Sequence, residues 1–282
     1  MQNRSTRISR LFERLHQEGR PGLIAYLTAG DPCPERTASL VAALEKGGAD
    51  LIELGVPFSD PIADGPVIQR AASRALQAGT TVERVLQIAD QIRQKSEIPL
   101  VLFTYLNPVL RYGFEKLAQD AVARGIDGCL LTDLSVEEAG KYVAVMRQHH
   151  LDTVFLAAPT STERRQRLVA EYSSGFIYLV SRTGVTGEQT SVSAAAAALV
   201  NSMRAVSSLP LAVGFGIANR AHAVEVGRLA DAVVVGSAFV RIVEQNLADA
   251  SLERKLEALA LELRDGLNQA SREPGQDITA KT

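Results

Sequence analysis

Residues 53–66 read Glu-Leu-Gly-Val-Pro-Phe-Ser-Asp-Pro-Ile-Ala-Asp-Gly-Pro. The largely apolar run 49–54 leads into this stretch and predicts a short buried strand, and the prolines and glycines after it predict a loop. Glu53 places a carboxyl group inside that strand. Burying an unpaired carboxylate costs several kcal/mol or raises its pKa, so such a residue is typical of a proton carrier. A buried glutamate held in a structural ion pair is the alternative.

Short apolar segments of the same kind recur along the rest of the chain, as expected of strands that are buried on both faces. Strands are predicted at residues 22–29, 51–54, 100–105, 128–132, 153–157, 176–180, 211–214 and 232–235. Helical spacing of apolar residues lies between them, at 35–46, 67–77, 82–95, 114–124, 136–149, 163–172, 193–205, 220–226 and 239–263. This alternation over about 250 residues predicts the α/β class and a (β/α)8 TIM barrel, with a doubly wound open sheet as the alternative.

An extra N-terminal helix is predicted at residues 7–16, because Ile8, Leu11, Phe12 and Leu15 follow helical spacing. This helix could plug one end of the barrel. No linker rich in proline, serine or charge divides the chain, so residues 1–270 are expected to form a single domain. Residues 271–282 are polar and are expected to form a disordered tail.

Composition excludes several classes of protein. The net charge of −2 offers no basic field for a nucleic acid. No apolar run approaches the roughly 18 residues of a membrane span, and residues 1–7 lack the apolar core of a signal peptide. Cys33 and Cys129 are far apart and have no metal or redox spacing. We therefore expect a cytoplasmic protein that binds neither nucleic acid nor a membrane.

Glycine and hydroxyl residues follow the last two predicted strands, where a (β/α)8 barrel usually binds phosphate. Gly216, Gly236 and Ser237 can aim backbone N–H groups and a hydroxyl at an anion. Gly187 could complete this phosphate site from the loop 182–191, whose composition also suits a lid. The alternative is that these glycines only make tight turns.

Two common routes of carbon–carbon cleavage lack their residues. A Schiff-base aldolase needs a lysine at a strand end, but the lysines lie in predicted helices, turns or the tail, at 46, 95, 116, 141, 255 and 281. A metal aldolase needs clustered ligands, and the histidines lack such spacing, at 16, 149, 150 and 222. Acid–base catalysis by carboxyl groups remains, from Glu53 in its strand and from Asp64 in the loop that follows.

The continuous stretch 53–66 resembles the signature of the tryptophan synthase alpha chain family, and the similarity extends from about Arg4 to about Arg264. The resemblance implies retro-aldol cleavage of indole-3-glycerol phosphate to indole and glyceraldehyde 3-phosphate, in the last steps of tryptophan biosynthesis. It also implies that Glu53 shuttles protons between the indole C3 and the glycerol hydroxyl. Asp64 would accept from the indole N–H and stabilise the cation that develops there.

By resemblance to the family, further residues of this chain are expected to contact the substrate. Phe103, Tyr105 and Leu130 match residues around the indole, Tyr178 matches a tyrosine near the glycerol, and Thr186 matches a loop residue that helps to place the catalytic acid. Aromatic and leucine residues at strand ends are more often plain core, which is the alternative reading.

Two further substrate-binding residues are expected at Tyr26 and Phe215. Tyr26 stands where the family commonly has phenylalanine, and Thr183 stands where it commonly has alanine. Neither departure touches the two acids, but both could alter the shape of the pocket or the motion of the loop.

The resemblance also implies a partner. The family's alpha chain carries no cofactor or metal and binds a beta chain that holds pyridoxal phosphate, in an alpha2beta2 heterotetramer. Pro57 and Asp60 lie in the loop that faces this partner in the family. The alternatives are a free-standing indole-3-glycerol-phosphate lyase, a non-catalytic subunit that kept the fold, and a sugar-phosphate isomerase on the same barrel. An isomerase would prefer a small polar pocket, whereas the matched residues are apolar and aromatic.

Overall fold

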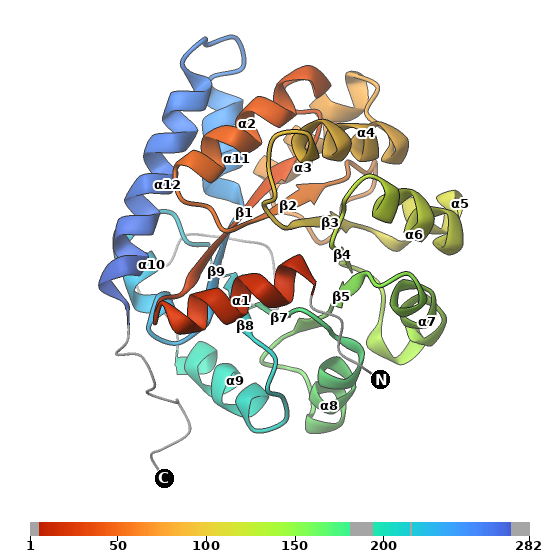
Figure 1. Cartoon of the computed structure of the whole chain (residues 1–282), viewed down its shortest axis with the longest axis vertical. Coiled ribbons are helices and arrows are strands. Elements are labelled where there is room, and N and C mark those ends of the chain that lie inside the picture. Colours follow the sequence, from red (N-terminus) through yellow and green to blue (C-terminus); the bar gives the residue numbers. More distant parts are fainter. Residues whose placement is uncertain (1–5, 181–193, 215, 272–282) are drawn as a thin grey trace.

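The computed structural model describes residues 6–180, 194–214 and 216–271. Within these ranges, parallel strands form one sheet in the order β5-β4-β3-β2-β1-β9-β8-β7-β6, and helices surround it (Figure 1). The strands are β1 Gly22–Thr28, β2 Leu51–Gly55, β3 Leu100–Thr104, β4 Gly128–Leu131, β5 Asp152–Val154, β6 Leu156–Ala157, β7 Ile177–Val180, β8 Leu211–Gly214 and β9 Ala232–Val235.

The strand order confirms the predicted (β/α)8 barrel. The first strand pairs with the last, β1 with β9, and every other pair joins neighbours in the chain. A doubly wound sheet would instead reverse its strand order near the middle. The alternative of an open sheet is therefore wrong.

The fifth predicted strand is split at Phe155. Its first part, β5, pairs with β4, and its second part, β6, pairs with β7. The side chain of Phe155 is buried in the core between strands and outer helices. The ring is closed by backbone hydrogen bonds, because the Ser174 N–H donates to the Thr153 carbonyl (2.7 Å) and the Tyr178 N–H donates to the Phe155 carbonyl (3.1 Å).

The helices agree with most of the predicted ranges. They are α1 Arg7–Gln17, α2 Pro34–Lys46, α3 Pro66–Gln77, α4 Val82–Arg93, α5 Leu106–Tyr112, α6 Phe114–Ala123, α7 Gly140–Gln148, α8 Glu163–Tyr172, α9 Ala194–Arg204, α10 Arg220–Gly227, α11 Ser237–Gln245 and α12 Leu252–Gln269, with a 3₁₀ turn, η1, at Val136–Glu138. None of the helices that the structure describes has the length and apolar character required to cross a membrane.

One predicted helix is wrong and another was not predicted. The range 239–263 contains two helices, α11 and α12, because Asn246 leaves helical geometry (φ −137°, ψ 32°). The carboxylate of Asp249 then accepts the Ser251 N–H (2.7 Å), a local bond that competes with helix formation. The short helix α5 was missed, because seven residues show little periodicity and Pro108 lies in its first turn.

Helix α1 closes one end of the barrel, as predicted, and crosses it in Figure 1. Its apolar face is buried in a cluster with inward-pointing strand residues. The cluster comprises Ile8, Leu11, Phe12 and Leu15 of α1 together with Ile24, Leu51, Val101, Leu130, Val154, Phe176, Ala212, Ala232 and Val234. Since this cluster fills the plugged end, we expect a ligand to reach the interior from the opposite end. Most of the predicted tail, residues 272–282, lies outside the described residues, and the single domain remains a prediction.

Aspartates at the start of strands fix the plugged end of the sheet. The carboxylates of Asp50, Asp127 and Asp231 accept the N–H groups of residues on neighbouring strands, Leu23, Leu100 and Leu211, each at 2.8 Å. Arginines neutralise these carboxylates. Arg93 and Arg7 pair with Asp127, Arg20 and Arg264 pair with Asp50, and Arg204 pairs with Asp231. These contacts fix the register of the strands, and with it the placement of residues at the open end.

Replacing Asp127 with alanine is expected to destabilise the fold by roughly 3–5 kcal/mol, because the change leaves buried charge without its partner. Only 5% of the Asp127 side chain is exposed, and the Leu100 N–H would also lose its acceptor. Urea unfolding would measure the effect. Glu163→Ala is the control, since its pair with Arg167 is exposed and is expected to contribute less than about 1 kcal/mol. Equal losses in the two variants would contradict the prediction.

Candidate active site

Strand β2 places Glu53 in the interior of the barrel. The residue is 1% exposed and is aligned with Tyr26 on β1 and Val101 on β3. Within the described residues, neither carboxyl oxygen has a hydrogen-bond partner. Burial raises the pKa of Glu53 to about 8, so the acid is mostly protonated at neutral pH. The alternative of a structural ion pair is not realised among these residues.

Asp64 lies in the loop between β2 and α3 and is 8% exposed. Burial raises its pKa to about 6, and a hydrogen bond from Tyr105 opposes that rise. The pKa values of the two acids therefore differ. As a consequence, Asp64 is mostly ionised at a neutral pH at which Glu53 is mostly protonated. Two carboxyl groups with pKa values pushed apart can take different roles in one reaction, one as a proton donor and the other as a fixed negative charge.

The loop that carries Asp64 is held by hydrogen bonds at several points. The Tyr105 hydroxyl accepts the Ala63 N–H (3.1 Å), and the Asp64 N–H donates to the Pro61 carbonyl (3.0 Å). The side-chain amide of Gln69 donates to the Asp64 carbonyl (2.9 Å). Tyr105 was predicted only as a residue around the indole, and its contact with this loop was not predicted. A polar side chain after a strand was the available signal, but its partner could not be identified from it.

Aromatic residues surround the two acids. Tyr26 and Phe103 meet edge to face, with ring centroids 5.1 Å apart. Phe103 and Tyr178 are partly buried and pack against the barrel cluster that contains Leu130. Burial raises the pKa of Tyr26 and of Tyr178, and the negative charges of Asp64 and Glu53 add to both shifts. The structure therefore brings Tyr26, Phe103, Tyr105, Leu130 and Tyr178 together around Glu53 and Asp64.

Two glycines leave room for the tyrosine hydroxyls. A Cβ on Gly55 would collide with the hydroxyl of Tyr26, and a Cβ on Gly214 would lie 2.9 Å from Cζ of Tyr178. The Tyr26 hydroxyl also shares a hydrogen bond with Thr28 (3.2 Å). The small residues on β2 and β8 thus let two large polar aromatics turn into the barrel without straining the sheet.

The predicted phosphate residues follow β8 and β9, which are neighbours in the sheet. Gly216 has a φ of +64°, a conformation that favours glycine, and a Cβ on it would meet nothing within 4 Å. Gly236 precedes α11, and Ser237 is the first residue of that helix. A helix N-terminus beside an open glycine loop suits an anion. Thr186, Gly187 and Phe215 lie outside the described residues, as do Thr183 and the loop 182–191.

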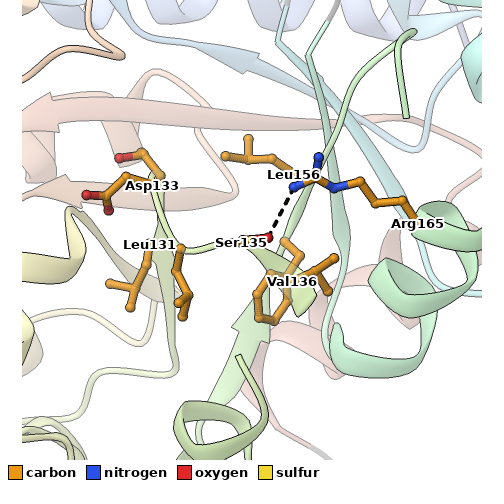
Figure 2. A pocket seen from close by; sticks show the side chains of 9 residues that line it. Leu131, Asp133, Ser135, Val136, Leu156 and Arg165 are labelled. Atoms are coloured by element: carbon orange, nitrogen blue, oxygen red, sulfur yellow. Dashed lines mark hydrogen bonds between the residues drawn. The ribbon is translucent and has the colours of Figure 1, made fainter. Parts of the chain in front are cut away.

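A cavity of about 190 Å³ lies around the residues that follow β4. Figure 2 shows the Arg165 side chain reaching towards Ser135, to which it donates a hydrogen bond (3.4 Å). The cavity is lined by Leu131, Thr132, Asp133, Leu134, Ser135, Val136, Phe155, Leu156 and Arg165. Thr132 contacts Tyr105, so this cavity adjoins the residue that holds the Asp64 loop, but neither Glu53 nor Asp64 lines it.

The fold and the site define a class of protein: a (β/α)8-barrel enzyme in which two buried carboxyl groups lie among apolar and aromatic side chains. The family model for the tryptophan synthase alpha chain matches residues 12–270. The chain belongs to the tryptophan synthase alpha chain family.

Individual relatives cover nearly the whole chain. The tryptophan synthase alpha chain of Solibacter usitatus is 66% identical over 261 residues, which are 93% of this chain and 98% of the relative. That of Geotalea uraniireducens is 50% identical over 249 residues, covering 88% and 93%. The solved structure of tryptophan synthase subunit alpha from Legionella pneumophila matches with a TM-score of 0.87 at 38% identity, covering 94% of this chain and 99% of that one.

Proposed function

We propose that Glu53 and Asp64 carry out the reaction of this family, the cleavage of indole-3-glycerol phosphate to indole and glyceraldehyde 3-phosphate. The chain is a lyase of tryptophan biosynthesis. One observation carries the residue assignment. Glu53 is a buried carboxyl group without a hydrogen-bond partner among the described residues, and the aromatic residues Tyr26 and Tyr178 lie near it. A fold keeps such a costly group where a proton must be delivered in the absence of water.

In the proposed reaction, Glu53 gives one proton to the substrate and takes one proton back from it. Glu53 in its acid form protonates C3 of the indole ring, which leaves positive charge near the ring nitrogen. Asp64 in its ionised form accepts a hydrogen bond from the indole N–H and stabilises that charge. Glu53, now a carboxylate, takes the proton of the glycerol hydroxyl. The carbon–carbon bond then breaks, its electron pair returns to the ring, and indole leaves as the aldehyde forms.

The surrounding residues support this substrate over a small sugar phosphate. Phe103, Leu130 and Tyr26 offer apolar surface of the kind that an indole ring needs, and Tyr178 offers a hydroxyl to the glycerol. Gly216, Gly236 and Ser237 would hold the phosphate at the N-terminus of α11. Thr186, Gly187 and Phe215 complete the proposed set by family resemblance.

Incubating the purified chain with indole-3-glycerol phosphate tests the proposal. Indole should appear together with an equal amount of glyceraldehyde 3-phosphate. Indole release would also dismiss the reading of a non-catalytic subunit. Interconversion of small sugar phosphates without indole release would favour the isomerase and overturn the proposal.

We propose further that the chain binds a beta chain that holds pyridoxal phosphate, in an alpha2beta2 assembly, and needs no cofactor of its own. A biosynthetic lyase of this kind would work in the cytoplasm. Exposed apolar side chains at the open end of the barrel support the partner. Ile62, beside Asp64, is 85% exposed, and Leu110 on α5 is 55% exposed. Both follow strands that line the site, so a partner seated there could receive indole directly.

Ile62→Asp is expected to weaken binding of the beta chain at least about tenfold, because it would bury a charge in the interface. The side chain is 85% exposed, so the free energy of unfolding should change by no more than about 0.5 kcal/mol. Titrating the beta chain while following indole consumption or calorimetric heat measures the affinity. Leu261→Asp is the control, since this residue is also exposed but lies on α12. Unchanged affinity in Ile62→Asp would place the interface elsewhere.

A further inference from the structure

A small buried cluster, separate from the main core, joins the two helices that begin at the candidate site. Tyr26 is buried with Ala71 of α3 and Val240 of α11, and Val67, Ile68 and Phe103 pack against them. Helix α3 begins two residues after Asp64, and α11 begins at Ser237. The cluster therefore connects the helix behind one proposed catalytic residue to the helix behind the proposed phosphate site.

Tyr26 contacts both sides of this connection. Its ring packs beside Gly236, where an added Cβ would lie 3.5 Å from the Cβ of Tyr26. Its hydroxyl lies over Gly55, two residues beyond Glu53 on β2. One side chain thus touches the strand that carries Glu53 and the loop that precedes α11.

A chain of ion pairs lies along the same two helices. Arg74 of α3 forms a bidentate pair with Asp31, through Nε (2.7 Å) and Nη2 (2.8 Å). Its third nitrogen, Nη1, donates to Glu244 of α11 (3.0 Å). Arg70, one turn earlier on α3, forms its own bidentate pair with Glu244 (2.7 and 2.8 Å). Three segments, α3, α11 and the loop after β1, are thereby held by planar guanidinium groups in fixed geometry.

Several side chains of these ion pairs are buried or partly buried. The Asp31 side chain is only 2% exposed, and those of Arg74 and Glu244 are 22% and 23% exposed. The hydrogen bonds from Arg70 and Arg74 lower the pKa of Glu244 to about 2, so its charge persists through the neutral range. The Arg70 side chain is half exposed, so the partly buried link between the helices is the one through Arg74, which joins Asp31 to Glu244.

We propose that Arg74 and Glu244 are positioning residues, which hold the Asp64 loop and the phosphate loop at the separation that cleavage requires. The inference rests on the proposed function. A substrate with a phosphate at one end and an indole ring at the other spans both loops. Its reacting carbon is therefore placed correctly against Glu53 only if the spacing between the loops is fixed. Misplacement by about 1 Å can cost up to about 100-fold in rate without removing any contact to substrate.

Glu244→Gln tests this role, because glutamine keeps the size of the side chain and removes the charge that both arginines hold. We expect kcat for indole release to fall roughly five- to tenfold. The inhibition constant of inorganic phosphate should stay within about twofold, since Gly216, Gly236 and Ser237 are unchanged. Arg70→Gln should cause a smaller loss of kcat than Glu244→Gln, because Arg74 would still hold Glu244.

Glu253→Gln is the matched control. Glu253 pairs with Arg36 (2.6 Å) between α12 and α2, and the two side chains are 29% and 25% exposed, close to the values for Glu244 and Arg74. Dividing each kcat by the folded fraction from urea unfolding removes any effect of stability. Equal corrected kcat values for Glu244→Gln and Glu253→Gln, or a wild-type kcat in Glu244→Gln, would overturn the inference. Failure of the wild-type chain to release indole would instead overturn the proposed function.

Discussion

Glu53→Gln is expected to lower kcat for indole release by at least about 10³-fold, while binding of inorganic phosphate stays within about twofold. Glutamine keeps the shape of the side chain but cannot give up or take up the proton. Proton transfer by a positioned side chain typically contributes 10²- to 10⁴-fold in rate, and here the same group would serve both proton transfers. Single-turnover assays with indole-3-glycerol phosphate measure the loss without interference from product release.

Thr104→Val is the control for changing a buried polar group, because this hydroxyl also lacks a partner among the described residues but lies outside the proposed machinery. The kcat of Thr104→Val should remain close to that of the wild type. Turnover of Glu53→Gln at the wild-type rate would remove Glu53 from the mechanism.

The pH dependence of the free energy of unfolding provides a second test of Glu53, again with the Glu53→Gln variant. The folded-state pKa of Glu53 is raised to about 8, above its unfolded value. Its contribution to stability is therefore fully present below about pH 4.5 and is lost as the pH rises towards 8, because only the unfolded chain releases the proton readily. Each unit of pKa difference corresponds to about 1.4 kcal/mol. Urea unfolding should show this decline for the wild type and a smaller one for Glu53→Gln.

Asp64→Asn is expected to lower kcat/KM for indole release by about 10²-fold. The amide keeps an acceptor for the indole N–H but loses the negative charge that would stabilise the developing cation, and removing one electrostatic stabiliser typically costs 10²- to 10³-fold. Phosphate binding should be unaffected, since Asp64 lies after β2 and the phosphate residues follow β8 and β9.

The pH profile separates the two acids. Asp64, with a pKa raised to about 6, must be ionised, and Glu53, with a pKa raised to about 8, must be protonated. The wild-type kcat/KM should therefore form a bell with limbs near pH 6 and pH 8. Asp64→Asn should lose the limb on the acid side and keep the other. A profile that keeps both limbs in this variant would assign the lower pKa to a different group.

Much of this architecture is predictable from local patterns. Short apolar runs alternating with helical periodicity predict the barrel, since strands buried on both faces and amphipathic helices differ in period. Helix α11 shows the limit of that reading. Apolar spacing continues from 239 to 263, but α11 ends at Gln245 and α12 begins at Leu252, with side-chain bonds of Asn246 and Asp249 in the turn between them. Periodicity does not detect such bonds, because they depend on single polar atoms.

The sequence shows that an acid lies within a strand of the candidate site, but it does not show whether that acid is held in an ion pair. The sequence places Glu53 among apolar neighbours, and that pattern alone left the structural ion pair open. Whether an arginine reaches it depends on residues far away in the chain. Several partly buried arginines instead pair with Asp50, Asp127 and Asp231 at the plugged end, and Arg74 pairs with Asp31, which becomes clear only once strand register is known.

The sequence by itself indicated the barrel, the plugging helix and the family, and it singled out two carboxyl groups as candidates, because each depends on residues close together in the chain or on a continuous motif. Only the tertiary structure decided that Glu53 has no partner among the described residues, that Tyr105 holds the Asp64 loop and that Tyr26 joins α3 to α11. These are contacts between segments tens to hundreds of residues apart. Their distances are set by the closure of the sheet, and no local pattern of residues encodes them.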